Sequence, residues 1–296
     1  MYLVTGASGH LGQAVINHLI NTYKVPANKI IATTREASKL TALAAQGVQV
    51  RDANFDDEAH LVKAFTGATR LLLISTNAME PGVRKHQHLN AVHAAEKAGV
   101  AHVIYTSMPS PETSAVSFAP DHAATEKALA ASNLKGWTVL RNNWYFENVL
   151  MSLPPALASG TQYSAAGQGK IAHIARNDLA HAAAAVLASD KGGKHSYTLS
   201  GAKQFTTDEI AAIVSKATGK PLKVMQVPVD GLIQGMLGAG LPEGMARMIA
   251  SFDANIAKGG LEGNATDFKT LTGVEPQGFE DWLKKNTAAF AAPAAH

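Results

Sequence analysis

One stretch decides the fold: Val4-Thr5-Gly6-Ala7-Ser8-Gly9-His10-Leu11-Gly12. It follows the apolar Tyr2-Leu3-Val4, which is typical of a buried strand, and leads into a segment whose apolar residues recur at helical spacing. Glycine lacks a Cβ and tolerates positive φ, so this turn lets the backbone approach a ligand closely. The helix directs free N–H groups and the positive end of its dipole at the same place. The stretch predicts a pyrophosphate site; the alternative is a tight turn that binds nothing.

Strand and helix patterns alternate after this turn as far as Arg141. We expect strands over 29–35, 48–51, 70–75, 102–107 and 137–141, and helices over 37–46, 57–65, 83–98 and 121–132. This alternation is typical of an α/β fold with a Rossmann-type, doubly wound parallel sheet. Right-handed crossovers would put the glycine turn at the carboxyl edge, near the point where the strand order reverses.

The regular alternation of strands and helices ends beyond Trp144. Short strands are expected over 162–164, 171–175, 196–199 and 223–227, and helices over 177–189 and 206–218. Thr206 and Glu209 have the spacing of a capping box at the start of the second helix. We therefore expect a dinucleotide-binding domain over 1–144 and a smaller C-terminal α/β lobe over 145–296, which covers the carboxyl edge and sends some segments back to the main domain.

Composition excludes several classes of protein. Of the 296 residues, 46% are hydrophobic and 17% charged, as in an ordinary globular protein, and the net charge of +3 comes without a basic patch for nucleic acid. The chain has no cysteine, which excludes disulfides, thiolate nucleophiles and Cys-based metal sites. No apolar run approaches the roughly 18 residues that a membrane span needs, and the first residues do not fit a signal peptide. We expect a cytoplasmic protein without a membrane span.

The end of the second strand predicts the type of cofactor. Sites selective for NAD place an acid there for the ribose 2′-hydroxyl, whereas NADP sites offer a cation to the 2′-phosphate. Here the position holds Arg35, with Lys39 one helical turn later and Glu36 beside it. This pattern favours NADPH; the alternative is a solvated arginine at the start of a loop.

Polar side chains follow three later strands. Ser75, Thr76 and Asn77 end the fourth strand and Thr106 the fifth, where hydroxyl and amide groups overlook the cofactor crevice. The sixth strand ends in the denser cluster Arg141-Asn142-Asn143-Trp144-Tyr145. Its polar groups and two aromatic rings suit a flat ring stacked near a nicotinamide, or else a domain junction packed by Trp and Tyr.

The usual proton-transfer pair of short-chain dehydrogenases is missing. Those enzymes carry Tyr-x-x-x-Lys, and none of the six tyrosines here has a lysine at that spacing. The corresponding helix has His122 in place of Tyr and Glu126 in place of Lys. Ketone–alcohol exchange is disfavoured, whereas hydride delivery to an electron-poor conjugated acceptor remains feasible because water can protonate the product. His122 and Tyr145 are the candidates to orient the substrate or assist proton delivery.

A metal site is not expected. His86, His88 and His93 fall on one helix, but only His86 and His93 share a face, and no carboxylate is spaced to complete a site.

These motifs together resemble the NmrA-like group of atypical short-chain dehydrogenases, most closely its quinone oxidoreductases. The resemblance covers nearly the whole chain and rests on the glycine turn, Arg35, Leu72-Leu73-Ile74-Ser75, 95–100, Tyr105-Thr106-Ser107, His122 with Thr125-Glu126, and 140–148.

The resemblance implies an enzyme that uses NADPH to reduce quinones or similar flat acceptors. It places on the cofactor the residues Gly6, Ala7, Ser8, Gly9, His10, Leu11, Arg35, Ser75, Thr76, Asn77, Arg141, Asn142, Asn143, Trp144, Tyr145 and Phe146. The group also contains proteins that sense the redox state of NADP(H) without turnover, so a regulatory protein is the alternative. A lignan-type reductase would need a lysine near Thr106, which is absent. A homodimer is left open.

Overall fold

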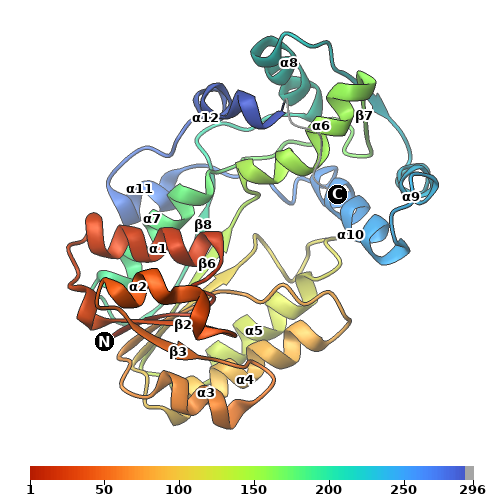
Figure 1. Ribbon diagram of the computed structural model, residues 1–296. Helices are drawn as coiled ribbons and strands as arrows, with labels where there is room; N and C mark the ends of the chain where they lie inside the picture. The colour runs from red at the N-terminus through yellow and green to blue at the C-terminus, as the bar shows by residue number, and fades with distance from the viewer. Residues whose placement is uncertain (291–296) are drawn as a thin grey trace.

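A parallel sheet forms the centre of the protein in the computed structural model, which describes residues 1–290 (Figure 1). The sheet has seven strands in the order β3-β2-β1-β4-β5-β6-β8. Every neighbouring pair in it is parallel. The strand order reverses between β1 and β4, so the expected doubly wound α/β fold is confirmed, and the glycine turn lies at its switch point.

The elements follow the expected alternation closely. The sheet strands are β1 (Tyr2–Val4), β2 (Ile30–Thr34), β3 (Gln49–Asp52), β4 (Arg70–Leu73), β5 (His102–Ser107), β6 (Gly136–Asn142) and β8 (Lys194–Leu199). A separate parallel pair consists of β7 (Thr161–Ser164) and β9 (Lys223–Gln226). The helices are α1 (His10–Asn21), α2 (Thr41–Ala45), α3 (Glu58–Phe65), α4 (Val83–Lys97), α5 (Ala119–Ala131), α6 (Val149–Ser159), α7 (Arg176–Ala188), α8 (Thr207–Thr218), α9 (Val229–Gly238), α10 (Glu243–Ile256), α11 (Thr266–Thr272) and α12 (Phe279–Asn286).

Helices cover both faces of the sheet (Figure 1). Helices α1, α7 and α11 pack on one face, where Val15, Ala183 and Phe268 are fully or almost fully buried. Helices α3, α4 and α5 pack on the other face through residues such as Phe65 and Leu129. Because both faces are covered, all residues of β5 are buried, as expected for a central parallel strand.

A second core lies at the carboxyl side of the sheet. It is built from α6, α8 and α12 around Phe146, Phe279 and Trp282. Helix α7 and strand β8 follow residue 145 in the chain but belong to the layers of the main sheet. A domain boundary at residue 145 stays a prediction.

The strand expected over 171–175 is wrong. This segment makes only isolated bridges, Tyr145 with Ile174 and Ile171 with Phe205. Ile174 packs in the core of the main sheet, whereas Ile171 packs in the second core. The segment is apolar because it passes between two cores, and its two backbone partners are different segments, so no ladder forms.

Two local expectations have clear outcomes. The expected helix over 37–46 is a 3₁₀ segment, Ala37–Leu40, followed by the short α2. The capping box at α8 is confirmed: the Thr206 hydroxyl accepts from Glu209 N at 3.2 Å, and the Glu209 carboxylate accepts from Thr206 N at 2.8 Å. Among residues 1–290, every helix is too short or too polar to cross a bilayer.

We expect His173 to make the stability of the second core sensitive to acid. Its ring stacks on Phe279 with centroids 6.0 Å apart, and burial lowers its pKa to about 4. Below pH 6.5 the unfolded chain takes up a proton that the folded protein resists until about pH 4. The free energy of unfolding should therefore fall on acidification through this window, by about 1.4 kcal/mol per pH unit for one histidine.

The expected change is a shallower pH dependence in the His173→Leu variant, measured by denaturant unfolding at several pH values between 4 and 6.5. The slope isolates the titration from any packing loss, which shifts all pH values alike. His195→Leu, at an exposed position, is the matched control. An unchanged slope in His173→Leu would show that His173 does not carry the acid sensitivity.

Candidate active site

The glycine turn has the shape of a phosphate cradle. Gly6 has a φ of +59°, and the Gly9 N–H donates to Gly6 O at 3.0 Å. A Cβ on Gly12 would lie 2.8 Å from Ala7 Cα, so only glycine allows the helix to start this close to the turn. Among the described side chains none caps α1, and its first turn has no acidic residue. These N–H groups fit the pyrophosphate of a dinucleotide.

Arg35 stands beside this cradle. The Ser8 and Thr34 hydroxyls, 2.8 Å apart, join the turn to the end of β2, and Arg35 follows with an exposed side chain. Glu36 pairs with Lys39 at 3.0 Å rather than with Arg35. Within residues 1–290, Arg35 forms no ion pair. Its guanidinium is therefore available to an anionic ligand.

Hydroxyl groups hold the ends of β4 and β5 together. The Ser75 N–H donates to Thr106 Oγ1 at 2.9 Å, and the Ile74 N–H donates to Thr5 Oγ1 at 2.9 Å. Asn77 lies beyond them with an exposed side chain. The structure thus brings the predicted Ser75 and Thr106 side by side at the carboxyl edge, at the ends of the first and second strands beyond β1.

Arg141 is engaged by a carboxylate of the protein. Its guanidinium donates to Glu126 at 3.0 and 2.5 Å, and the Ser107 hydroxyl donates to the same carboxylate at 2.6 Å. The hydrogen bond that Arg141 donates to Glu126 raises the pKa of Arg141. Glu126, which replaces the lysine of the usual pair, therefore holds Arg141 in place.

The predicted residues 142–146 serve mainly as a junction between the two cores. Asn143 donates to Ser200 Oγ and Leu261 O at 3.1 and 3.0 Å. Trp144 packs on Phe252 of α10 with ring centroids 3.9 Å apart, and Phe146 is buried in the second core.

The flanking Asn142 and Tyr145 are also enclosed. Asn142 is buried, with its Oδ1 unpartnered among the described residues. Arg176 lies over the Tyr145 ring at 5.7 Å, and burial raises the pKa of Tyr145. Contacts of these five residues with a cofactor stay predictions.

His122, Tyr105 and His88 form a buried row of hydrogen bonds between β5 and helices α4 and α5. The Tyr105 hydroxyl lies 2.7 Å from His122 Nδ1 and 3.2 Å from His88 Nδ1. His88 Nε2 accepts from Thr76 N at 3.0 Å. Burial, with a contribution from Arg84, lowers the pKa of His122 to about 3. His122 is therefore a neutral imidazole near physiological pH.

Comparison with known proteins decides the family. Residues 2–283 match the profile of the NmrA-like family. This chain belongs to the NmrA-like family.

Similar proteins of known activity support the assignment to this family. Quinone oxidoreductase 2 of Escherichia coli (strain K12) is 42% identical over 272 residues, which cover 92% of either chain. A crystal structure of NADPH-dependent quinone oxidoreductase from E. coli with NADPH superposes with a TM-score of 0.91, at 39% identity over 96% of this chain and 99% of that one. Triphenylmethane reductase of Citrobacter sp., in complex with NADP(H), has a TM-score of 0.88 at 36% identity, over 96% and 99% of the two chains.

Sequence reasoning missed two residues of the site in this NmrA-like protein. Tyr105 lies inside a buried strand, and His88 is one of three histidines on a helix without the spacing of a metal site. A buried tyrosine hydroxyl usually finds a partner, which was the available signal at Tyr105. Nothing in the sequence indicates that the partners are His88 and His122, because they come from two different helices.

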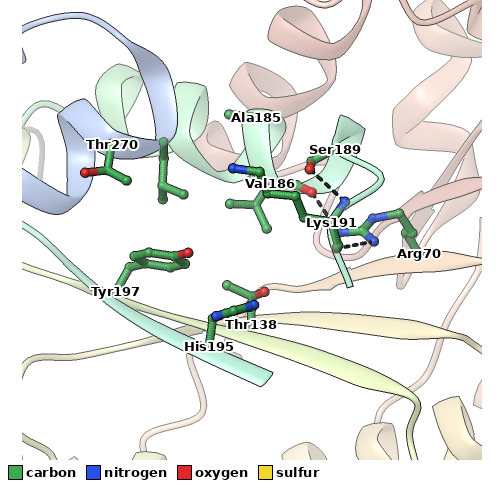
Figure 2. Close-up of a pocket in the computed structure, with 10 residues that line it drawn as sticks. Arg70, Thr138, Ala185, Val186, Ser189, Lys191, His195, Tyr197 and Thr270 are labelled. Carbon is green, nitrogen blue, oxygen red and sulfur yellow. Dashed lines mark hydrogen bonds between the residues drawn. The ribbon is translucent and has the colours of Figure 1, made fainter. Parts of the chain in front are cut away.

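A small cavity lies at the end of the sheet where the strands begin, and Figure 2 shows the side chains that line it. It holds about 70 Å³ and is lined where β4, β6 and β8 begin, by Arg70, Thr138 and His195. The Arg70 guanidinium donates hydrogen bonds to carbonyl oxygens at the end of α7, including Val186 O at 2.9 Å. This cavity is remote from the glycine turn, which lies at the carboxyl edge. Within residues 1–290, no cluster of His, Asp and Glu is arranged to hold a metal ion.

The Glu126–Arg141 pair is expected to stabilise the NmrA-like fold. Glu126→Ala leaves Arg141 half-buried without its partner and removes the acceptor of Ser107, so it should lower the free energy of unfolding by about 2 kcal/mol. Denaturant unfolding measures this change. Glu243→Ala breaks an exposed pair with Arg247 and should change stability by less than about 0.5 kcal/mol. Equal effects of the two substitutions would contradict the assigned role.

Proposed function

We propose that this NmrA-like protein is an oxidoreductase that uses NADPH to reduce quinones or similar flat, electron-poor acceptors. The observation that carries the proposal is Arg35, an exposed cation at the end of β2 beside the glycine cradle, with Glu36 neutralised by Lys39. A cation suits the 2′-phosphate of NADPH, where a site selective for NAD offers an acid. The relatives named for quinone and triphenylmethane reduction support the same activity.

Residues at the carboxyl edge of the sheet would form the cofactor site. The backbone of 6–11 would hold the pyrophosphate, and Arg35 the 2′-phosphate. The groups at 75–77 and Thr106 would face the ribose and nicotinamide, with Arg141 and its neighbours at 142–146 bordering the ring. NADPH, when bound, supplies a hydride.

The acceptor side suits an electron-poor ring rather than a ketone. The lysine of the usual Tyr-x-x-x-Lys pair is replaced by Glu126, which is hydrogen-bonded to Arg141. A quinone needs one hydride and one proton to become a hydroquinone, and water can supply the proton to its exposed oxygen. An aromatic row offers an apolar wall beside His122: the ring centroids of Phe118 and Phe252 are 5.7 Å apart, and the Trp144 ring packs at a tilt on Phe252.

The test is oxidation of NADPH by the purified full chain across a panel of quinones and triphenylmethane dyes, with NADH in parallel. We expect turnover with at least one quinone and a preference for NADPH. Failure to oxidise NADPH with every acceptor would overturn the proposed activity.

His122 and Tyr145 are the proposed contacts of the acceptor. Loss of a well-placed polar group at a reacting centre commonly costs about a hundredfold in rate. We expect His122→Ala with Tyr145→Phe to lower kcat for a quinone to about that extent, while the Kd for NADPH rises less. Steady-state kinetics and calorimetry measure the two quantities. An unchanged kcat would remove both residues from the mechanism.

We propose a cytoplasmic protein, since the chain lacks cysteine and the described helices cannot span a bilayer. A homodimer stays a prediction, and sedimentation velocity tests it directly.

A further inference from the structure

The direction of the buried hydrogen-bonded row is set at one end by a backbone group. The Thr76 N–H points to His88 Nε2 at 3.0 Å, and a backbone N–H can only donate. His88 Nε2 must therefore accept. A neutral imidazole with an accepting Nε2 carries its proton on Nδ1.

The same logic fixes the next bond. Thr125 Oγ1 donates to Asp121 O at 2.7 Å, so it is free to accept from His88 Nδ1–H at 3.0 Å. The Tyr105 hydroxyl reaches two ring nitrogens, His88 Nδ1 and His122 Nδ1. The first already carries a proton, so the Tyr105 O–H donates to His122 Nδ1, the shorter contact at 2.7 Å.

The last atom of the row is His122 Nε2, which carries the ring proton because Nδ1 accepts. Among the described residues, Nε2 has no hydrogen-bond partner. It also differs from the fully buried unpartnered atoms in retaining some contact with solvent. Phe118 flanks the ring at 5.8 Å and continues into the aromatic row with Phe252 and Trp144. The free N–H therefore belongs to a ring that Phe118 connects to the apolar wall proposed for the acceptor.

We propose that Tyr105 and His88 are positioning residues that hold His122 with its proton on Nε2, so that His122 donates a hydrogen bond, rather than a proton, to the acceptor oxygen. The role toward the acceptor rests on the proposed function; the tautomer does not. As the hydride arrives, negative charge grows on that oxygen, and a fixed N–H donor stabilises it. The proton then comes from water.

The row cannot act as a proton relay. If His122 gave up its Nε2 proton and took one from Tyr105, the tyrosine would need a proton from His88. His88 has only its Nδ1 proton, because its other nitrogen faces the Thr76 N–H. The charges around the row also favour a neutral ring: Arg84, on α4, opposes an imidazolium at both histidines. Of the two acids on α5, Glu126 is hydrogen-bonded to Arg141, and Asp121 interacts electrostatically with the positive charge of Arg84.

The direct test reads the tautomer by ¹⁵N-edited NMR of the histidine rings in the full chain without cofactor. We expect His122 to carry its proton on Nε2 in the wild type. In Tyr105→Phe the fixed form should give way to a mixture, whereas Tyr23→Phe, at the distant α1 end, should leave the His122 signals unchanged. A proton on Nδ1 in the wild type, or an unchanged tautomer in Tyr105→Phe, would overturn the proposal.

His88 gives an independent arm that separates positioning from folding. His88→Gln keeps an acceptor for Thr76 N–H and a donor for the row, so it should preserve the His122 tautomer; His88→Leu should lose it. Tyr105→Phe should lower kcat with a quinone about tenfold, the size of one lost hydrogen bond, without changing the Kd for NADPH. Between pH 5 and 8 the wild-type kcat should show no histidine titration. If the chain reduces no quinone, the proposed function is wrong, but the NMR measurement still tests the His122 tautomer independently.

Discussion

Gly12→Ala is expected to weaken binding of NADPH about thirtyfold and to lower the free energy of unfolding by about 2 kcal/mol, because overpacking a close contact costs this much. The added Cβ would lie 2.8 Å from Ala7 Cα and nearer still to the Gly6 carbonyl oxygen. Both contacts are backbone, so no side chain can move aside. The start of α1 must shift away from the turn, and its N–H groups then miss the phosphates. Calorimetry and denaturant unfolding measure the two effects.

Gly235→Ala is the matched control. Gly235 lies within α9, and a Cβ there would meet no atom within 4 Å. Alanine is the better helix former, so this variant should bind NADPH normally and gain up to about 1 kcal/mol of stability. Normal NADPH binding by Gly12→Ala would contradict the assignment of the turn as the phosphate site.

Arg35→Ala is expected to raise the KM for NADPH about thirtyfold and to leave the KM for NADH almost unchanged, since a charge-assisted hydrogen bond contributes about 2 kcal/mol. The physical reason is the 2′-phosphate, which only NADPH carries. The exposed position of Arg35 means that its removal leaves no buried partner behind, so stability should not change. Steady-state kinetics with both nucleotides measures the difference.

Arg247→Ala provides the control for a lost surface charge. Arg247 is an exposed arginine on α10, paired with Glu243, and its loss should affect neither nucleotide. If Arg35→Ala changed the two KM values equally, the argument for NADPH would be wrong.

The parts of the fold predicted from sequence are those with local causes. The glycine turn, the alternation of strands and helices, and the capping box at Thr206 each depend on residues a few positions apart. The strand predicted over 171–175 is wrong because the apolar residues of this segment indicate burial alone. Whether a buried segment has a strand beside it depends on distant parts of the chain.

The candidate site divides in the same way. Gly6 and Arg35 follow their strands directly, so their place at the carboxyl edge could be derived. The pairing of Arg141 with Glu126 could not, because one residue ends a strand and the other lies on the preceding helix, and either charge alone fits a ligand equally well. The row from Thr76 to His122 joins a loop, a strand and two helices, and only their packing brings it together.

The most direct measurement is a single turnover, with the purified protein in excess over NADPH and one quinone present. The proposed function predicts that each NADPH consumed yields one hydroquinone, because one hydride from NADPH and one proton from water convert one quinone. A redox sensor would behave differently. If NADPH bound but stayed unoxidised, and its affinity differed from that of NADP⁺, the chain would be a sensor of the NADP(H) state and the central claim would be wrong.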